Sequence, residues 1–216
     1  MDLRLHHAVS GRRIDELRSL VQQGLDPNGR SNSGGTPLHW AAKCSVPAAI
    51  DILMAASADV DARDEDYRTP LILACFEMTQ WDEDDEKDRM DPKNEQLELI
   101  KALLSNGASV NAVDSSGRSA LHMAAMRSNP LVCQALIERG ADLGLVDNKG
   151  RTVRDACSLS KNKLCLAVID AHAPKIKTTL VRPKGQDDDD SEVDSEDEEL
   201  PHDATKTALE QFFPRP

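Results

Sequence analysis

Aromatic residues are scarce in this sequence: they make up 3% of the 216 residues, and only one of them is Tyr. Long apolar runs are absent as well, because no stretch approaches the roughly 20 residues that a membrane-spanning helix requires. The opening segment, MDLRLHHAVSGRR, lacks the apolar core of a signal peptide. We therefore expect a protein of the cytoplasm, the nucleus or both, without contact to a membrane.

Paired cysteines and catalytic motifs are also missing. There is no Cys-x-x-Cys motif, and the five cysteines are scattered over positions 44, 75, 133, 157 and 165. Their odd number and irregular spacing indicate a reducing compartment, with no disulfide framework and no metal site. The motifs GxxxxGK(S/T), HExxH and GxSxG do not occur. We expect a protein that is not an enzyme and has no cofactor.

The charge is concentrated in two segments of a chain whose formal net charge is −12. Residues 186–200, QDDDDSEVDSEDEEL, hold ten acids and no base, and residues 81–95 hold eight acids and three bases. The rest of the chain is nearly neutral. This balance argues against neutralisation of nucleic-acid phosphates, so direct binding to nucleic acid is not expected.

Two sequence patterns recur with the same spacing. The first occurs as TPLHWAA at Thr36, TPLILAC at Thr69, SALHMAA at Ser119 and TVRDACS at Thr152. The second occurs as GLDPN at Gly24, SADVD at Ser57, GASVN at Gly107 and GADLG at Gly140. Both give offsets of 33, 50 and 33, and the interval of 50 exceeds the period by 17 residues. The chain is therefore a repeat protein with one insertion.

The pattern resembles the ankyrin repeat over residues 1–172. The resemblance implies an all-α solenoid of five helix-pair units, of which the first and the last act as caps. In this family Thr-Pro-Leu-His opens the first helix, where Thr36 can cap the helix and Pro37 occupies a first-turn position that needs no N–H. The resemblance also implies that His39 and His122 hydrogen-bond the turn of the neighbouring repeat.

Glycines of the pattern fall where left-handed backbone is expected. Gly107 and Gly140 follow second helices, whereas the turns between repeats contain Gly34, Gly117 and Gly150. The sequence departs from the pattern at Tyr67, which stands where a turn normally has Gly, and at Ser57, which follows a second helix in place of Gly.

Three parts of the chain are expected. Residues 1–172 form the ankyrin-repeat domain, whose acidic insertion near 79–95 is a loop between the two helices of the third unit. Residues 173–200 form a disordered linker that is first basic and then acidic. Residues 201–216 form a short linear motif at the C-terminus.

Partner contacts on the repeats are expected at the turns and on the exposed side of the first helices. Counting along the repeat places three pairs on that concave side: Lys43 and Cys44, Phe76 and Glu77, and Met126 and Arg127. Phe76 and Met126 are large apolar residues at normally exposed positions, so either a partner or the 79–95 loop should cover them. Tyr67 is expected as an exposed aromatic at a turn tip, which is typical of interface anchors.

The acidic run has more than one interpretation. Ser191 and Ser195 lie in SEVD and SEDE, which match the acidic-directed pattern of casein-kinase-type phosphorylation. The run itself is either a solubilising tail or a mask for a basic client, such as a ribosomal protein or a histone.

The segment KTALEQFF near the C-terminus resembles the PIP box, the peptide by which replication and repair proteins bind the sliding clamp. One helical turn would place Leu209, Phe212 and Phe213 on the same face. The first position of the family pattern is Gln, and here it is Lys206. The alternative is a turn that docks on the protein's own apolar surface.

These observations together indicate a monomeric adaptor for protein–protein interaction. The repeats would hold one protein and the C-terminal motif another, with the sliding clamp as the specific candidate. The alternative is an escort for a basic client protein, in which the acidic segments are the active element.

Overall fold

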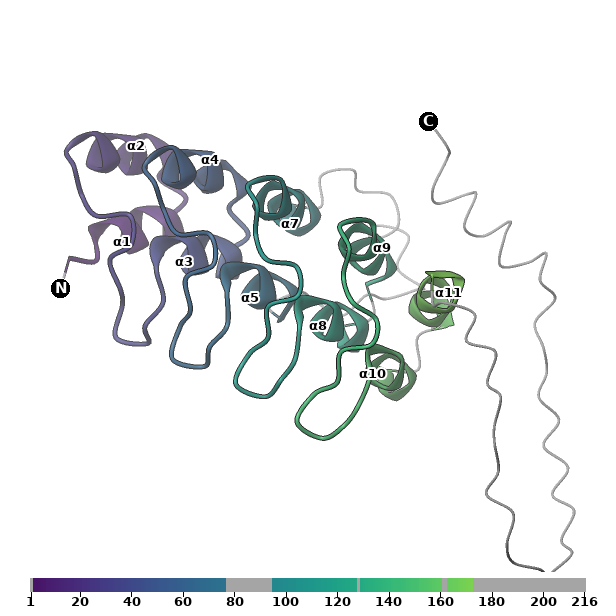
Figure 1. The fold of residues 1–216 in the computed structure, drawn as a ribbon. Coiled ribbons are helices and arrows are strands. Elements are labelled where there is room, and N and C mark those ends of the chain that lie inside the picture. The colour runs from purple at the N-terminus through teal and green to yellow at the C-terminus, as the bar shows by residue number, and fades with distance from the viewer. Residues whose placement is uncertain (1, 77–94, 128, 161–162, 173–216) are drawn as a thin grey trace, which may run out of the picture. The chain divides into compact units, whose positions relative to one another are not determined.

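A computed structural model describes residues 2–76, 95–127, 129–160 and 163–172 of the chain (Figure 1). This part contains ten α-helices and no β-strand. In chain order they are α1 Arg4–Ser10, α2 Ile14–Gln22, α3 Pro37–Lys43, α4 Pro47–Ala55, α5 Pro70–Phe76, α7 Glu95–Ser105, α8 Ala120–Met126, α9 Pro130–Glu138, α10 Val153–Ser160 and α11 Lys163–His172. The expected all-α repeat solenoid of five helix pairs is confirmed.

The helices form two rows, and Figure 1 shows loops that project from one of them. The first helices α1, α3, α5, α8 and α10 contact one another in that order, and so do the second helices α2, α4, α7, α9 and α11. Each projecting loop leads into the first helix of the next unit. The interval between α5 and α7 contains the 79–95 insertion, almost all of which lies outside the described residues.

The core lies between the two rows. Leu38, Leu71 and Leu121 of the first helices are completely buried, as are large apolar residues of the second helices. In the last unit Arg154 takes the place of this Leu, stays exposed, and forms an ion pair with Asp170 at 2.8 Å. The final unit therefore presents a charged pair to solvent at a position where the inner units bury Leu, as an end repeat requires.

A histidine on each of three first helices connects one unit to the next. The ring Nε2 atoms donate to backbone carbonyls at 3.1, 3.0 and 3.3 Å, in the pairs His6–Gly35, His39–Arg68 and His122–Arg151. For His39 and His122 this confirms the expectation from the family resemblance. Burial lowers the pKa of all three imidazoles below the ordinary value.

In two of these three histidines the other ring nitrogen, Nδ1, forms a hydrogen bond with the residue that precedes the helix. The Nδ1 atom of His39 accepts from the backbone N–H of Thr36 at 3.1 Å, and Ser119 serves His122 in the same way. The Nδ1 atom of His6 has no hydrogen-bond partner among the described residues, and Leu3, which precedes α1, has no side-chain hydroxyl. The N-terminal unit thus has the inter-unit bond but lacks the hydroxyl cap.

The turns before α5, α8 and α10 share one arrangement. In each, an Asp accepts from backbone N–H groups and pairs with the Arg four residues later, as Asp64–Arg68, Asp114–Arg118 and Asp147–Arg151. The hydrogen bond from Arg151 holds the pKa of Asp147 well below its usual range. Tyr67 adopts the left-handed φ of 61° that Gly117 and Gly150 adopt at 74° and 72°. The turn therefore forms despite the missing glycine.

Candidate binding surface

The seventh residue of each first helix is exposed or half-buried. These residues are Ser10, Lys43, Phe76, Met126 and Leu159. In α8 the neighbouring positions Leu121, Ala124 and Ala125 are completely buried, whereas Met126 is 38% exposed. Leu159 of α10 is 65% exposed. Because consecutive first helices contact each other, Phe76, Met126 and Leu159 form a row, which we call the stripe.

Two guanidinium groups contact the aromatic ring at one end of the stripe. The Cζ atoms of Arg68 and Arg127 lie 5.8 and 5.0 Å from the centroid of the half-buried Phe76 ring. Arg68 is also held by Asp64 and Asp66, each at 2.9 Å. Arg127 forms no ion pair with a carboxylate of the described residues. Its guanidinium therefore adds a cation to the stripe.

Lys43 occupies the equivalent position one unit earlier. Its Nζ atom lies 5.8 Å from the centroid of the Trp40 ring on the same helix. The edge of His6 meets that ring at an interplanar angle of 88°, with the ring centroids 6.2 Å apart. Lys43 thus extends the surface beyond the stripe with a cation that contacts the Trp40 ring.

The first helices have an unusual charge composition for so acidic a chain. Helices α1, α3, α5 and α8 contain no Asp and no Glu, although the net charge of the chain is −12. The single acid of α10, Asp155, accepts hydrogen bonds from the backbone N–H and the hydroxyl of Thr152 at 2.8 Å. The described part of this face therefore combines apolar groups with positive charge.

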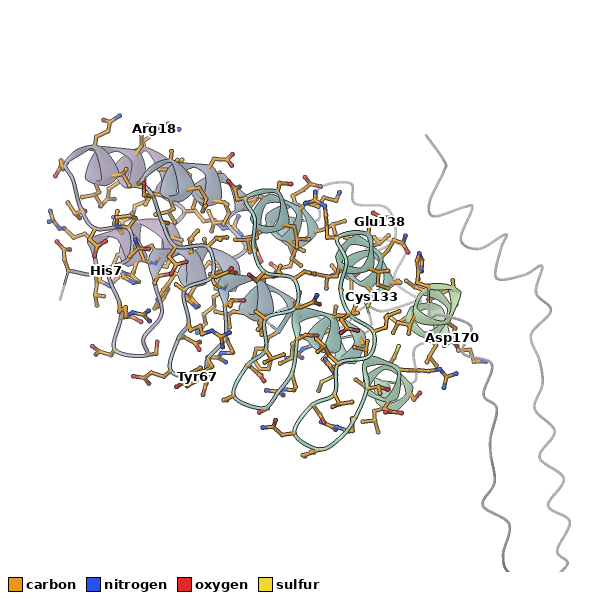
Figure 2. All side chains as sticks on the ribbon, viewed as in Figure 1. His7, Arg18, Tyr67, Cys133, Glu138 and Asp170 are labelled. Carbon is orange, nitrogen blue, oxygen red and sulfur yellow. The ribbon has the colours of Figure 1, made fainter. Side chains whose placement is uncertain are left out.

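The structure brings some of the expected contact residues together and separates others. Phe76, Met126 and Arg127 are neighbours at the ends of α5 and α8, and Lys43 continues their row. Tyr67 lies on the turn before α5, among the projecting loops (Figure 2). Its ring is 59% exposed and lies 5.9 Å from the Cζ atom of Arg63. The remaining expected residues, Lys206, Leu209, Phe212, Phe213, Ser191 and Ser195, lie outside the described residues.

Leu159 and Arg68 belong to this surface, but the sequence analysis did not select them. Leu159 stands 33 residues after Met126, so the repeat period alone points to it. The capping role that the resemblance implies for the last unit does not by itself indicate a contact residue there. Arg68 belongs to a turn, and its contact with Phe76 depends on how the turn folds against α5, which the repeat period does not specify.

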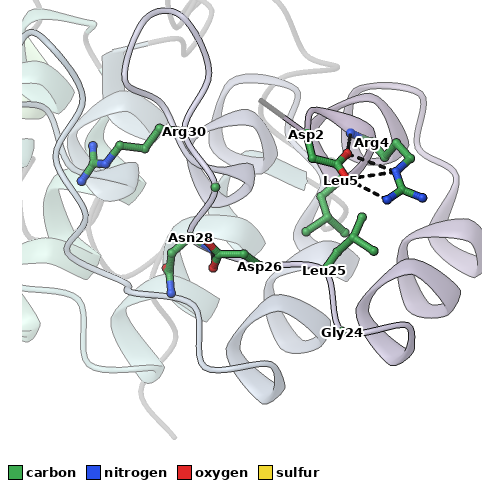
Figure 3. Close-up of a pocket in the computed structure, with 9 residues that line it drawn as sticks. Asp2, Arg4, Leu5, Gly24, Leu25, Asp26, Asn28 and Arg30 are labelled. Carbon is green, nitrogen blue, oxygen red and sulfur yellow. Dashed lines mark hydrogen bonds and ion pairs between the residues drawn. The ribbon is translucent and has the colours of Figure 1, made fainter.

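A separate hollow lies at the N-terminal end of the stack (Figure 3). Its volume is about 690 Å³, and the start of α1 and the segment after α2 line it. Asp2 and Arg4 form an ion pair across 2.7 Å there, and hydrogen bonds from Arg4 lower the pKa of Asp2 to about 2. Leu5 and Leu25 contribute apolar surface. The residues that line the hollow include no Cys, Ser or His.

The thiols and the other titratable groups suggest no reaction centre in the part of the chain that the structure describes. Cys75, Cys133, Cys157 and Cys165 are buried and belong to the core. Burial strongly raises the pKa of Cys75, so its thiol stays protonated. Within the same described residues, no cluster of His, Cys, Asp or Glu has the grouping of a metal site, and no helix is both long and apolar enough to cross a membrane.

The stacked helix pairs and their projecting turns define a repeat scaffold for protein–protein interaction. Two family models match the sequence. The model for ankyrin repeats (3 copies) matches residues 5–80, and the model for ankyrin repeats (many copies) matches residues 92–137. Together with the fold, they show that the chain belongs to the ankyrin-repeat family.

Several curated proteins are similar to this chain. Neurogenic locus notch homolog protein 1 of Homo sapiens is 35% identical over 126 residues, and that of Xenopus laevis is 36% identical over the same length. Neurogenic locus notch homolog protein 2 of Mus musculus is 35% identical over 129 residues. The alignments cover 58% to 59% of this chain and 4% of the relatives' own length.

Proposed function

We propose that the chain is a non-enzymatic adaptor that binds one protein through the stripe and a second protein through its C-terminal motif. The observation that carries the first part is the row of large apolar side chains on consecutive units, with Met126 38% and Leu159 65% exposed. Single exposed apolar residues are common on protein surfaces, but a contiguous row is typical of a binding site. Burial of such side chains against a partner contributes about 1.5–3 kcal/mol each before the costs of association.

The stripe can be tested with a matched pair of variants in the full chain. In the double variant Met126→Ser/Leu159→Ser, partners that contact the stripe should be lost in affinity purification from cell extract. Val146→Ser is the control, because Val146 is 53% exposed but lies on a projecting turn outside the stripe. If both variants retain the same partners, the stripe is not a binding surface.

The second part of the proposal concerns Leu209, Phe212 and Phe213. Two of the three Phe of the chain lie in this short, otherwise polar segment, and their spacing is that of the sliding-clamp-binding peptide. A peptide of residues 201–216 should bind the clamp, and Lys206→Gln should tighten binding because it restores the family's first position. The double variant Phe212→Ala/Phe213→Ala should abolish it. A peptide that binds no clamp would leave this part of the proposal without its specific partner.

An escort for a basic client, such as a ribosomal protein or a histone, is the alternative function. The ten acids of residues 186–200 favour it, and phosphorylation of Ser191 and Ser195 would add negative charge there. The first-helix face does not favour a basic client, because α1, α3, α5 and α8 hold no carboxylate. Escort binding should weaken sharply between low and physiological salt, whereas binding of the apolar C-terminal motif should respond little.

A chain truncated after Gly185 separates the two binding regions. Partners that the truncated chain retains belong to the repeats, and partners that it loses belong to the tail. We further propose that the protein acts as a monomer in the cytoplasm, the nucleus or both, without direct binding to nucleic acid.

A further inference from the structure

We propose that the stripe selects an acidic peptide segment in which a large apolar side chain recurs at every third residue, bound in the polyproline II conformation. This inference rests on the proposed function of the stripe and deepens it. The ligand is a segment of another protein, and both its charge and its spacing follow from the first-helix face.

The charge follows from the groups that surround the stripe. Arg127 contacts the Phe76 ring, and no carboxylate of the described residues pairs with it. Lys43 is exposed in the next position of the row. Helices α3, α5 and α8 contain no acid, and the one acid of α10, Asp155, accepts hydrogen bonds from Thr152. An acidic segment is therefore complementary to this face, and a basic one is not.

The spacing follows from the stacking of the helices. Packed helices lie about 8–10 Å apart, so equivalent residues on neighbouring first helices recur at about that distance. Polyproline II has three residues per turn and a rise of about 3.1 Å, which brings every third side chain to the same side about 9.3 Å apart. A β-strand presents same-side residues about 6.6 or 13 Å apart, so it does not match the row.

An α-helical segment with an apolar residue at every seventh position would also match, because seven residues rise by about 10.5 Å. Polyproline II is favoured because it is already a major conformer of the unbound chain, so less ordering is needed on binding. In this arrangement three apolar side chains of the segment contact Phe76, Met126 and Leu159 in turn. A carboxylate between them faces Arg127, and one where the segment extends past Phe76 faces Lys43.

Three labelled peptides test the inference by fluorescence anisotropy with the full chain. The first, ELEPLEPLE, has Leu at every third position. The second, EPLELELPE, has the same composition with Leu at every second position, and the third, KLKPLKPLK, reverses the charge. We expect a Kd of about 100 µM for the first peptide and at least tenfold weaker binding for the other two. A fourth peptide with Leu at every seventh position should also bind at least tenfold more weakly.

Two single variants place the first peptide on the stripe. Arg127→Glu should weaken its binding about tenfold, and Leu159→Ser about as much, whereas Val146→Ser should leave it unchanged. Both altered side chains lie at the surface, so equal melting curves of all variants by circular dichroism should confirm that the fold is intact.

The outcomes separate this inference from the proposed function. Equal binding of the first two peptides overturns the spacing rule, and stronger binding of the Lys peptide overturns the charge rule. Preference for the peptide with Leu at every seventh position overturns the polyproline II conformation. If the first peptide fails while Met126→Ser/Leu159→Ser still loses a partner from extract, only the ligand chemistry is wrong. If that double variant loses no partner and no peptide binds, both proposals fall.

Discussion

Ser57 is the clearest place where a substitution should stabilise the repeats. It follows α4 at the position that Gly24, Gly107 and Gly140 occupy after other second helices, and it adopts a left-handed φ of 66°. Left-handed backbone costs an L-residue roughly 1–2 kcal/mol, which Gly avoids. The Ser57 side chain is exposed, so no core contact is lost when it is removed. Ser57→Gly should therefore relieve strain without creating a cavity.

The expected gain is smaller than the strain itself, because Gly also makes the unfolded chain more flexible. That entropic loss is roughly 0.5–1 kcal/mol, which leaves a net stabilisation of about 0.5–1 kcal/mol. For a chain of this size such a change raises Tm by about 1–4 °C. Denaturation with urea, followed by circular dichroism, should show a higher midpoint at an unchanged slope.

Gly107→Ser is the reciprocal variant. Gly107 has a φ of 86°, and a Cβ added there meets no atom within 4 Å. The cost of the substitution is therefore conformational rather than steric, and it should match the gain at Ser57 with opposite sign. The reasoning is refuted if Ser57→Gly destabilises the protein, or if Gly107→Ser has no effect on the midpoint.

Three further outcomes are expected. Val168→Asp should destabilise the protein by several kcal/mol, because it buries an unpaired carboxylate in α11. Lys163→Asp, on the exposed side of the same helix, should be nearly neutral. Equal melting temperatures of the two variants would mean that the last helix pair does not stack. Deletion of residues 79–95 should leave the helical signal and cooperative melting intact, and an unfolded deletion variant would place the insertion in the core. Stability should fall as pH falls through the ordinary histidine pKa of 6.5, because burial lowers the pKa of His39 and His122 and the unfolded state then binds protons more readily. His122→Gln should flatten this decrease between about pH 7 and pH 5.5, and an unchanged slope would exclude the histidine origin.

The repeat period predicted a repeat protein with one insertion, and the resemblance to the ankyrin repeat implied the all-α fold. Because two independent patterns share the spacing, they fixed the positions of the helix starts and of the turns before helix geometry was known. The histidines that join neighbouring units followed from the family pattern, and His39 and His122 bond as expected. Even Tyr67 obeys the period, since the backbone of its turn accepts the left-handed conformation without glycine.

The binding surface was only partly predictable. The period placed Phe76 and Met126 in one row, because equivalent positions of stacked helices share a face. It did not reveal that two arginines contact the Phe76 ring, because that contact depends on the path of a turn and on side-chain conformations. The exposure of Leu159 depends on the position of α10 in the last unit, where no further repeat is available to cover it.

The last unit therefore has two roles, and different residues serve each of them. Arg154 and Asp170 form an exposed ion pair, as the solvated end of a stack requires. Leu159, on the same helix α10 as Arg154, instead continues the row of Phe76 and Met126. A repeat that served only as a cap would gain from a polar residue at that position, because an exposed Leu lowers solubility without adding to the core. The row begins as Ser10 and Lys43 and becomes apolar only in the third unit, so a partner of the stripe should depend on the last three units by contact. Of the first two units, only Lys43 of α3 should contact that partner, and the rest should affect it only through the stability of the stack.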